Sequence, residues 1–285
     1  PVVASVPRDP SKSVPVREHR YYNACSGRWQ EQFELIDAWL ENTLFLGEAM
    51  PQFAPDHGPD QWAAFFGADL KFDESVVATN WVDPVIDCWE DALPLELKEN
   101  NATWQHLLAY GRAMREHSEG RYLVGNIDHH SNADALSALR GPTGFCMDLM
   151  DCPELIDRAM RGVRNAYGPV NDAVYQACGL GEERGACRSF WHERSFSMVQ
   201  SDVIGLMGPE HFRRFVLPAI EEEAAYHEAV CFHLDGVDAL KHLDDILGIE
   251  AIDVLQWIPG AGKAQSFEWL DVLQRAQAAG KAVQV

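Results

Sequence analysis

The last fifth of the chain alternates between short apolar runs and segments with helical periodicity, and this pattern constrains the fold most strongly. The apolar runs Ala229–Leu234, Ile252–Trp257 and Ala282–Val285 are typical of buried strands. Between them, apolar residues recur every three or four positions, and Gly248 and Gly280 stand where glycine commonly ends a helix. Strands joined by helical crossovers pair in parallel. The pattern therefore predicts an α/β fold with a parallel sheet.

Polar and aromatic side chains lie at the ends of the predicted strands. A further apolar run at Tyr122–Gly125 predicts another strand, and Phe190–Val199 is expected to contain one or two more. In folds of alternating parallel strands and helices, catalytic and binding residues lie at the C-terminal strand ends. For Trp257, packing in the core is the more common role of such a residue. The side chains expected to bind substrate are Asp128, His130, Gln200, Asp202, Gln256 and Trp257.

The composition limits the partners that the chain is expected to have. With 285 residues, 47% of them hydrophobic, the chain is long enough to bury a substantial core without disulfides. The net charge of −21 argues against binding to nucleic acid or to anionic membrane surfaces. The sequence shows no apolar run of membrane-spanning length and no signal-peptide pattern at its start. Seven cysteines without a Cys-x-x-Cys pair predict reduced thiols, and the expected location is cytoplasmic.

The domain organisation is expected to be a short lead-in followed by one large domain. Prolines within residues 1–31 favour an extended lead-in, and residues 32–285 are expected to form a single domain that begins with a helix from Gln32 to about Met50. Residues 51–101 are rich in Pro and Trp with poor periodicity, which predicts an irregular lid containing a β-pair near Ser75–Trp81. The chain starts without Met and stops at a predicted strand, so a C-terminal strand–helix unit is expected to be missing.

His233 and Asp235 are the strongest candidates for catalysis and metal binding. They lie two positions apart at the end of a predicted strand, so both side chains are expected on the same face of the sheet. A neutral imidazole and a carboxylate are both zinc ligands, and a bound zinc ion can lower the pKa of a thiol or polarise a substrate. The alternative is a hydrogen-bonded His–Asp pair with a structural or acid–base role, which the two residues alone favour.

Two other polar clusters have less specific patterns. Glu193 follows His192, and because adjacent strand residues point to opposite faces, only one of the two can face a site. Glu193 is a candidate metal ligand or general base, although a surface position is slightly favoured. The sequence Asp128-His129-His130 could bind metal or transfer protons, and a solvent-facing loop is the equal alternative.

Several short motifs resemble those of a known superfamily. They are Leu139-Arg140-Gly141, Asp151-Cys152-Pro153-Glu154, Val199-Gln200-Ser201-Asp202, Gly208-Pro209-Glu210-His211-Phe212, Phe232-His233-Leu234-Asp235-Gly236 and Leu255-Gln256-Trp257-Ile258-Pro259-Gly260. Together they resemble the uroporphyrinogen decarboxylase-like superfamily, which includes the heme-pathway decarboxylase and cobamide-dependent methyltransferases. The resemblance runs from about Gln32 to Val285 and is densest after Val199. It implies a (β/α)8 TIM barrel with an N-terminal elaboration.

The chain departs from both branches of this superfamily. The decarboxylases carry an Arg-Gln-Ala-Gly-Arg loop near the N-terminus that binds substrate carboxylates, and the nearest match here, Cys25–Arg28, is poor. The zinc methyltransferases carry His-x-Cys where this chain has His233-Leu234-Asp235, and a further Cys near the C-terminus. A carboxylate in place of the thiolate weakens zinc binding and favours a harder ion, or leaves only a hydrogen-bonded pair. A third metal ligand, where one exists, is expected outside this sequence.

The expected function is methyl transfer on a small methylated or methyl-accepting molecule, because the arginine loop of the decarboxylases is missing. His233 and Asp235, with Glu193 as a further participant, are expected to hold a zinc ion or relay protons. The resemblance implies a separate corrinoid protein as the partner that supplies or takes the methyl group. Two alternatives remain: decarboxylation of a porphyrinogen or another carboxylate, and a barrel that has lost catalysis and serves as a binding subunit.

Overall fold

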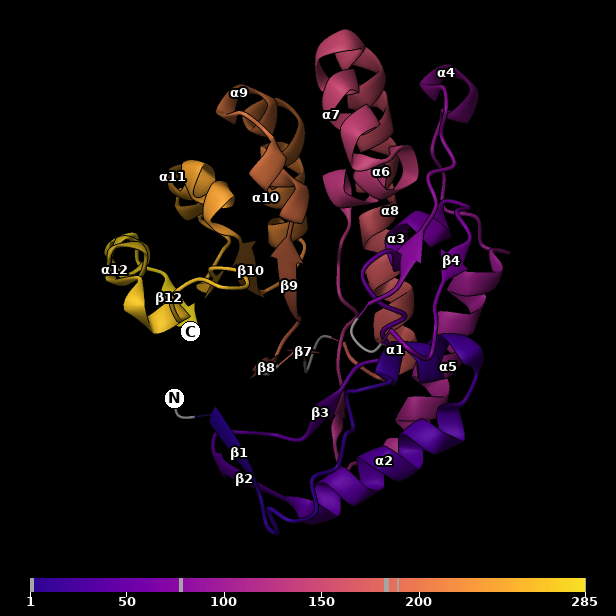
Figure 1. The fold of residues 1–285 in the computed structure, drawn as a ribbon, viewed down its shortest axis with the longest axis vertical. Helices are drawn as coiled ribbons and strands as arrows, with labels where there is room; N and C mark the ends of the chain where they lie inside the picture. The colour runs from indigo at the N-terminus through magenta and orange to yellow at the C-terminus, as the bar shows by residue number, and fades with distance from the viewer. Residues whose placement is uncertain (1–2, 77–78, 182–184, 189, 285) are drawn as a thin grey trace.

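The structure, a computed structural model, describes residues 3–76, 79–181, 185–188 and 190–284. Its main sheet has four parallel strands in the order β12-β11-β10-β9 (Figure 1). These strands are β9 (Phe196–Gln200), β10 (Ala229–Asp235), β11 (Val254–Ile258) and β12 (Ala282–Gln284). The three strands predicted near the C-terminus are confirmed to within two residues, with Val285 outside the described residues. The predicted α/β class with a parallel sheet is therefore confirmed.

A second parallel pair joins distant parts of the chain. β3 (Gln52–Phe53) pairs in parallel with β6 (Leu123–Val124), which confirms the strand predicted at 122–125. Beyond β6, the backbone N–H of Asn126 donates to Ala186 O at 2.6 Å, in the antiparallel hairpin of β7 (Gly185–Cys187) and β8 (Phe190–His192). The strand pairing among the described residues thus forms two separate parallel sheets and does not show a closed barrel.

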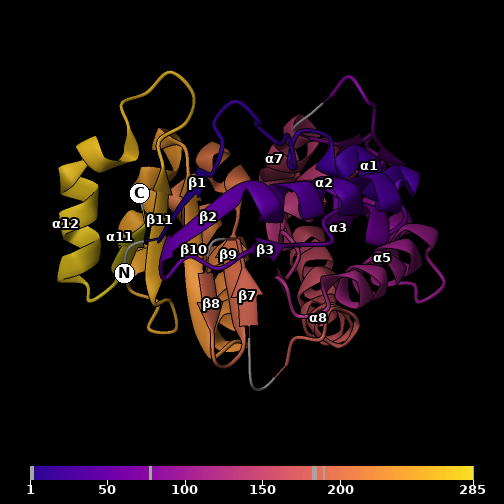
Figure 2. The ribbon, with the colours of Figure 1, turned by 90° about the horizontal axis from the view of Figure 1, so that it is seen from below.

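Helices follow the strands of the main sheet, as the alternating pattern predicts. α10 (Leu217–Ala225), α11 (Leu243–Leu247) and α12 (Leu270–Ala278) come after β9, β10 and β11. α11 and α12 lie on the side of the sheet away from α8 (Pro153–Cys178), as Figure 2 shows. The remaining α-helices are α1 (Arg20–Ser26), α2 (Trp29–Asn42), α3 (Gln61–Phe65), α4 (Trp89–Ala92), α5 (Ala102–Ser118), α6 (Asn132–Arg140), α7 (Pro142–Asp151) and α9 (Pro209–His211).

A π-helical turn precedes Pro218. Between α9 and α10, residues Phe212–Val216 form this turn, and Pro218 lies in the first turn of α10. Proline has no N–H for the α-helical bond to the carbonyl four residues earlier, so the regular α-helical bonding is interrupted here.

The N-terminal part of the chain is more regular than its sequence predicts. The lead-in contains β1 (Val3–Pro7), which pairs antiparallel with β2 (Thr43–Gly47), and the helix α1. The first helix of the expected domain ends at Asn42 rather than near Met50, because Thr43 turns into β2 with extended dihedral angles. Leu44 therefore belongs to a strand, although it continues the helical apolar spacing.

The segment 51–101, expected to be an irregular lid, contains several short regular elements. It supplies β3 to a parallel pair, and it contains the short helices α3 and α4. The expected β-pair forms between β4 (Leu70–Lys71) and β5 (Trp81–Val82), which are antiparallel. Part of its connection, residues 77–78, lies outside the described residues.

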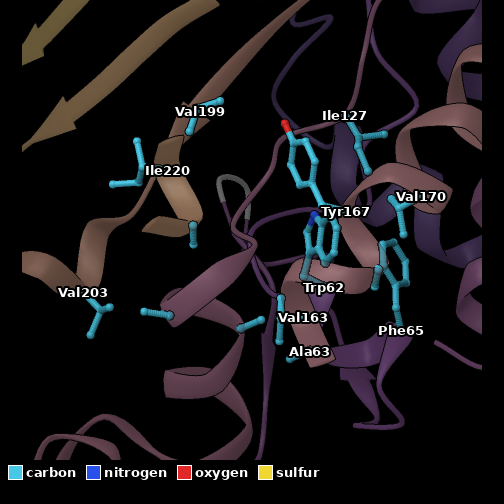
Figure 3. Packing of buried hydrophobic residues seen from close by; sticks show 14 of the residues in the cluster. Trp62, Ala63, Phe65, Ile127, Val163, Tyr167, Val170, Val199, Val203 and Ile220 are labelled. Carbon is cyan, nitrogen blue, oxygen red and sulfur yellow. The ribbon is translucent and has the colours of Figure 1, made fainter. Parts of the chain in front are cut away.

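The hydrophobic core joins the N-terminal helices to the main sheet. Buried residues recur every three or four positions along α8, among them Val163, Tyr167 and Val170, as expected for a helix with one face in the core. The rings of Trp62 in α3 and Tyr167 stack with their centroids 6.1 Å apart (Figure 3). The same core reaches Val199 in β9, so it holds the sheet against the helical half of the molecule. None of the helices that the structure describes is long and apolar enough to cross a membrane.

Candidate metal and substrate site

A row of polar side chains crosses the main sheet at one level. The strand register places Gln200, His233, Gln256 and Gln284 opposite one another on β9, β10, β11 and β12. Residues at the same level of neighbouring parallel strands point to the same face. His233 Nδ1 is hydrogen-bonded to Gln256 Oε1, and Gln256 Nε2 donates to Gln284 Oε1 at 2.8 Å. His233, one of the candidate metal ligands, belongs to this row.

Asp202 joins the predicted pair of His233 and Asp235. One ligand atom from each of these three residues lies within 4.8 Å of the other two. Asp202 begins a 3₁₀ turn directly after β9, while His233 and Asp235 belong to the C-terminal end of β10. A candidate for the third ligand therefore lies within this sequence, whereas such a ligand was expected outside it.

The protonation of this cluster suits a bound cation. Burial, together with the positive charge of Arg188, lowers the pKa of His233, so its imidazole is neutral at pH 7 and keeps a lone pair. Burial and the nearby carboxylates of Asp134 and Asp235 raise the pKa of Asp202 to about 7. A cation among these groups would favour the ionised carboxylate of Asp202. One imidazole and two carboxylates are a donor set that fits a divalent metal ion with a position left for substrate.

The loop after β6 brings Asp128 to the same face of the sheet. The buried Asp128 carboxylate accepts hydrogen bonds from Gln200 Nε2 and Arg188 Nη2, both at 2.6 Å. Burial alone would raise the pKa of Asp128, but the charges of Arg188 and His130 hold it well below its usual range. Asp128 is thus a permanent anion whose charge is already balanced by Arg188.

His130 is a partly buried cation between three carboxylates. Its Nδ1 lies 3.3 Å from Asp134 Oδ2 and 3.7 Å from Asp202 Oδ2, and its Nε2 lies 3.7 Å from Asp128 Oδ2. Burial opposes the charge, but the hydrogen bond to Asp134 and the charge of Asp128 raise the pKa of His130 to about 10. Asp134 also accepts the backbone N–H groups of Asp202 and Val203, both at 2.9 Å. Asp134 therefore anchors the turn that carries Asp202.

A pocket of about 230 Å³ opens beside the polar row. Asp128, Arg188 and Gln256 line one side of it, and Arg17 and Arg20 from the N-terminal segment line another. Within the described part of the chain, the Arg17 guanidinium makes no hydrogen bond or ion pair. Three arginines therefore line one small pocket, although the chain as a whole has a net charge of −21.

Arg17, Arg20 and Asp134 were not predicted from the sequence to be site residues. The two arginines belong to a segment that was expected to be an extended lead-in without a role in the site. The available signal was a pair of arginines three positions apart near the start of a strongly acidic chain. Such a pair is common on solvated surfaces, so the sequence could not place it at a pocket.

Two predicted site residues lie elsewhere. Glu193 is exposed in the turn between β8 and β9, before the N-terminal end of β9, whereas Asp202 follows its C-terminal end. Trp257 is fully buried and packs against Trp269, with ring centroids 5.4 Å apart. Trp257 is adjacent to Gln256 on β11, so it points to the opposite face, toward the helices. Neither Glu193 nor Trp257 contributes to the candidate site.

Comparison with known proteins gives one informative similarity. No family model matches the chain, and no curated protein matches it. A solved structure described as a methyltransferase from Methanosarcina mazei is similar with a TM-score of 0.61 and 12% sequence identity. The similarity covers 95% of this chain and 84% of that chain. The chain therefore shares the overall fold of this methyltransferase.

Proposed function

We propose that the chain is a metal-dependent methyltransferase that acts on a small anionic molecule. The observation that carries the proposal is the cluster of Asp202, His233 and Asp235 at the C-terminal ends of two adjacent parallel strands. The fold shared with a methyltransferase supports it. We also propose that the two parallel sheets are parts of one (β/α)8 barrel wall, since Asn126 N, just beyond β6, bonds to Ala186 O in β7, and β7 lies beside β9.

The three ligands define what a bound metal ion would do. One imidazole and two carboxylates accept zinc, and the lack of a thiolate favours a harder divalent ion. When bound, the ion would lower the pKa of a substrate thiol or polarise a substrate oxygen. The chain's own residues orient the ligands: Gln256 bonds to His233, and Asp134 holds the turn that begins with Asp202.

The arginines indicate the charge of the substrate. Arg188 is paired with Asp128. Among the described residues, Arg17 makes no hydrogen bond or ion pair, and the only hydrogen bond of the Arg20 side chain is to the Tyr21 hydroxyl. Planar guanidinium groups bind carboxylates and similar anions with two parallel hydrogen bonds. A volume of about 230 Å³ suits a small molecule. We therefore propose that Arg17 and Arg20 bind an anionic group on the substrate while its reacting end faces the metal ligands.

The methyl carrier is proposed to be a corrinoid bound to a separate protein. This part of the proposal rests on the resemblance to the cobamide-dependent methyltransferases. In the corresponding reaction, the cobalt–carbon bond of a methylcorrinoid breaks, its electron pair stays on cobalt, and the methyl group bonds to a substrate thiolate.

Decarboxylation of a small carboxylic acid is the second candidate function. The observation that favours it is the presence of Arg17 and Arg20 at the pocket, because missing arginines were the reason to set this function aside. A site that binds no metal and releases carbon dioxide from a carboxylic acid would support it. A chain that neither binds metal nor turns over either class of substrate would be a binding protein.

The first test measures metal binding. Elemental analysis of the purified protein should find about one divalent metal ion per chain. His233→Ala and Asp202→Asn should each lose this metal while keeping the far-ultraviolet circular dichroism spectrum of the wild type. His192→Ala, which removes a histidine from the hairpin before β9, serves as the control and should keep it. Metal-free wild-type protein after loading with zinc, manganese or iron would contradict the proposed site.

The second test measures methyl transfer with two matched thiols. Methylcobalamin is the methyl donor, and 3-mercaptopropionate and uncharged 2-mercaptoethanol are the acceptors. The wild type should demethylate methylcobalamin faster with the carboxylated thiol. Arg17→Gln and Arg20→Gln should reduce the rate only with 3-mercaptopropionate. Equal rates with both thiols in all variants would refute the role of the arginines, and no transfer with either would refute methyl transfer from cobalamin to thiols.

A further inference from the structure

The hydrogen bonds of the polar row run in one direction. Gln284 Oε1 accepts a hydrogen bond from Gln256 Nε2 at 2.8 Å. This contact orients the Gln256 amide so that its nitrogen faces Gln284 and its oxygen faces His233. An amide oxygen can only accept a hydrogen bond. With the two amides in this orientation, the His233 ring atom in contact with Gln256, Nδ1, carries the proton.

On the β9 side, no described residue makes a hydrogen bond to the His233 ring. Gln200, its neighbour on β9, uses its amide nitrogen to bind the Asp128 carboxylate at 2.6 Å. Among the described residues, the buried Gln200 Oε1 has no hydrogen-bond partner, so it does not hold the His233 ring. Within the part of the chain that the structure describes, the ring is thus hydrogen-bonded only from the β11 side. A neutral imidazole with its proton on Nδ1 has its lone pair on Nε2.

We propose that Gln256, oriented by Gln284, is a positioning residue that holds His233 as the Nδ1–H tautomer. Nε2 is then the ring atom that binds a metal ion together with Asp202 and Asp235. The inference rests on the proposed function for the identity of the ligand, and on the hydrogen-bond row for the tautomer. Partners that fix the tautomer of a metal-binding histidine commonly change metal affinity about 10- to 100-fold when removed.

The tautomer can be measured without metal or substrate. Two-bond proton–nitrogen correlation spectra of ¹⁵N-histidine-labelled, metal-free protein distinguish the two neutral tautomers, and His233→Ala identifies the His233 signals. The wild type should show the Nδ1–H form. Gln256→Met, which removes the acceptor, should shift His233 to the Nε2–H form or to a mixture. Gln256→Glu keeps an acceptor oxygen and should restore the wild-type pattern, and Gln284→Leu should give an intermediate result.

A metal titration supplies the second readout. Gln256→Met should bind cobalt(II) about 10- to 100-fold more weakly than the wild type. Gln277→Met, on the exposed side of α12, makes a matched substitution away from the row and should match the wild type in both measurements. An Nε2–H tautomer in the wild type, or an unchanged tautomer in Gln256→Met, would overturn the inference. If instead the tautomer behaves as expected but the wild type binds no cobalt(II), the proposed function fails and the positioning of His233 stands.

Discussion

Glu223 is a buried acid whose titration should control the pH dependence of stability. It lies in α10 with 1% of its surface exposed and accepts hydrogen bonds from Ser131 Oγ at 2.7 Å and Asn132 Nδ2 at 3.1 Å. Ser131 ends the loop that carries Asp128 and His130 into the site, and Asn132 begins α6. Burial raises the pKa of Glu223 from 4.5 to about 8 despite these hydrogen bonds.

The sign of the effect follows from proton linkage. Between pH 4.5 and about 8 the unfolded chain releases this proton while the folded chain keeps it, so stability falls as the pH rises. The full difference corresponds to about 5 kcal/mol at about 1.4 kcal/mol per pH unit. Glu223→Gln keeps the shape of the side chain and removes the titration. The free energy of unfolding of the variant, minus that of the wild type, should therefore increase by about 3 kcal/mol from pH 5.5 to pH 7.5.

Urea unfolding followed by tryptophan fluorescence measures this difference at each pH. Glu221→Gln removes an exposed carboxylate from the same helix and serves as the control. The comparison between variants cancels the titration of all other groups. Parallel curves for Glu223→Gln and the wild type would show that Glu223 is ionised in the folded protein, and the reasoning from burial would be refuted.

Two further predictions concern packing. Trp257→Ala should lower the free energy of unfolding by about 3–5 kcal/mol in urea titrations, because it leaves a cavity at a buried position. The same variant should leave the cobalt(II) affinity unchanged. The control Trp191→Ala, at a half-exposed ring, should lower the free energy of unfolding by less than about 1 kcal/mol. Gly162→Ala should lower the melting temperature and cost about 1–3 kcal/mol, since its new Cβ would lie 2.6 Å from Leu95 O. Gly205→Ala, with its nearest atom at 3.7 Å, should have little effect, and equal losses in both glycine variants would contradict the packing argument.

The apolar runs of the C-terminal part were sufficient to predict strands β10, β11 and β12 and their parallel pairing. A short buried run must have its backbone N–H and C=O groups hydrogen-bonded, which a strand within a sheet achieves. Because the connections between these runs are long enough to contain a helix, the strands can pair in parallel. The same local geometry placed His233 and Asp235 on one face, since the strand repeat is two residues. These features depend on neighbouring residues alone, so the sequence by itself determined them.

The composition of the site depended on the tertiary structure. Arg17 and Arg20 line the pocket, although their surroundings in the sequence resemble ordinary solvated surface. Asp202 was expected to bind substrate, and only the fold shows that it lies beside His233 and Asp235. Local periodicity predicts that Gln256 and Trp257 face opposite sides of β11. It does not predict which of the two sides carries the site. Only the packing of Trp269, at the start of α12, against one face of the sheet decided that Trp257 is in the core and Gln256 in the polar row, because burial is a property of the assembled layers.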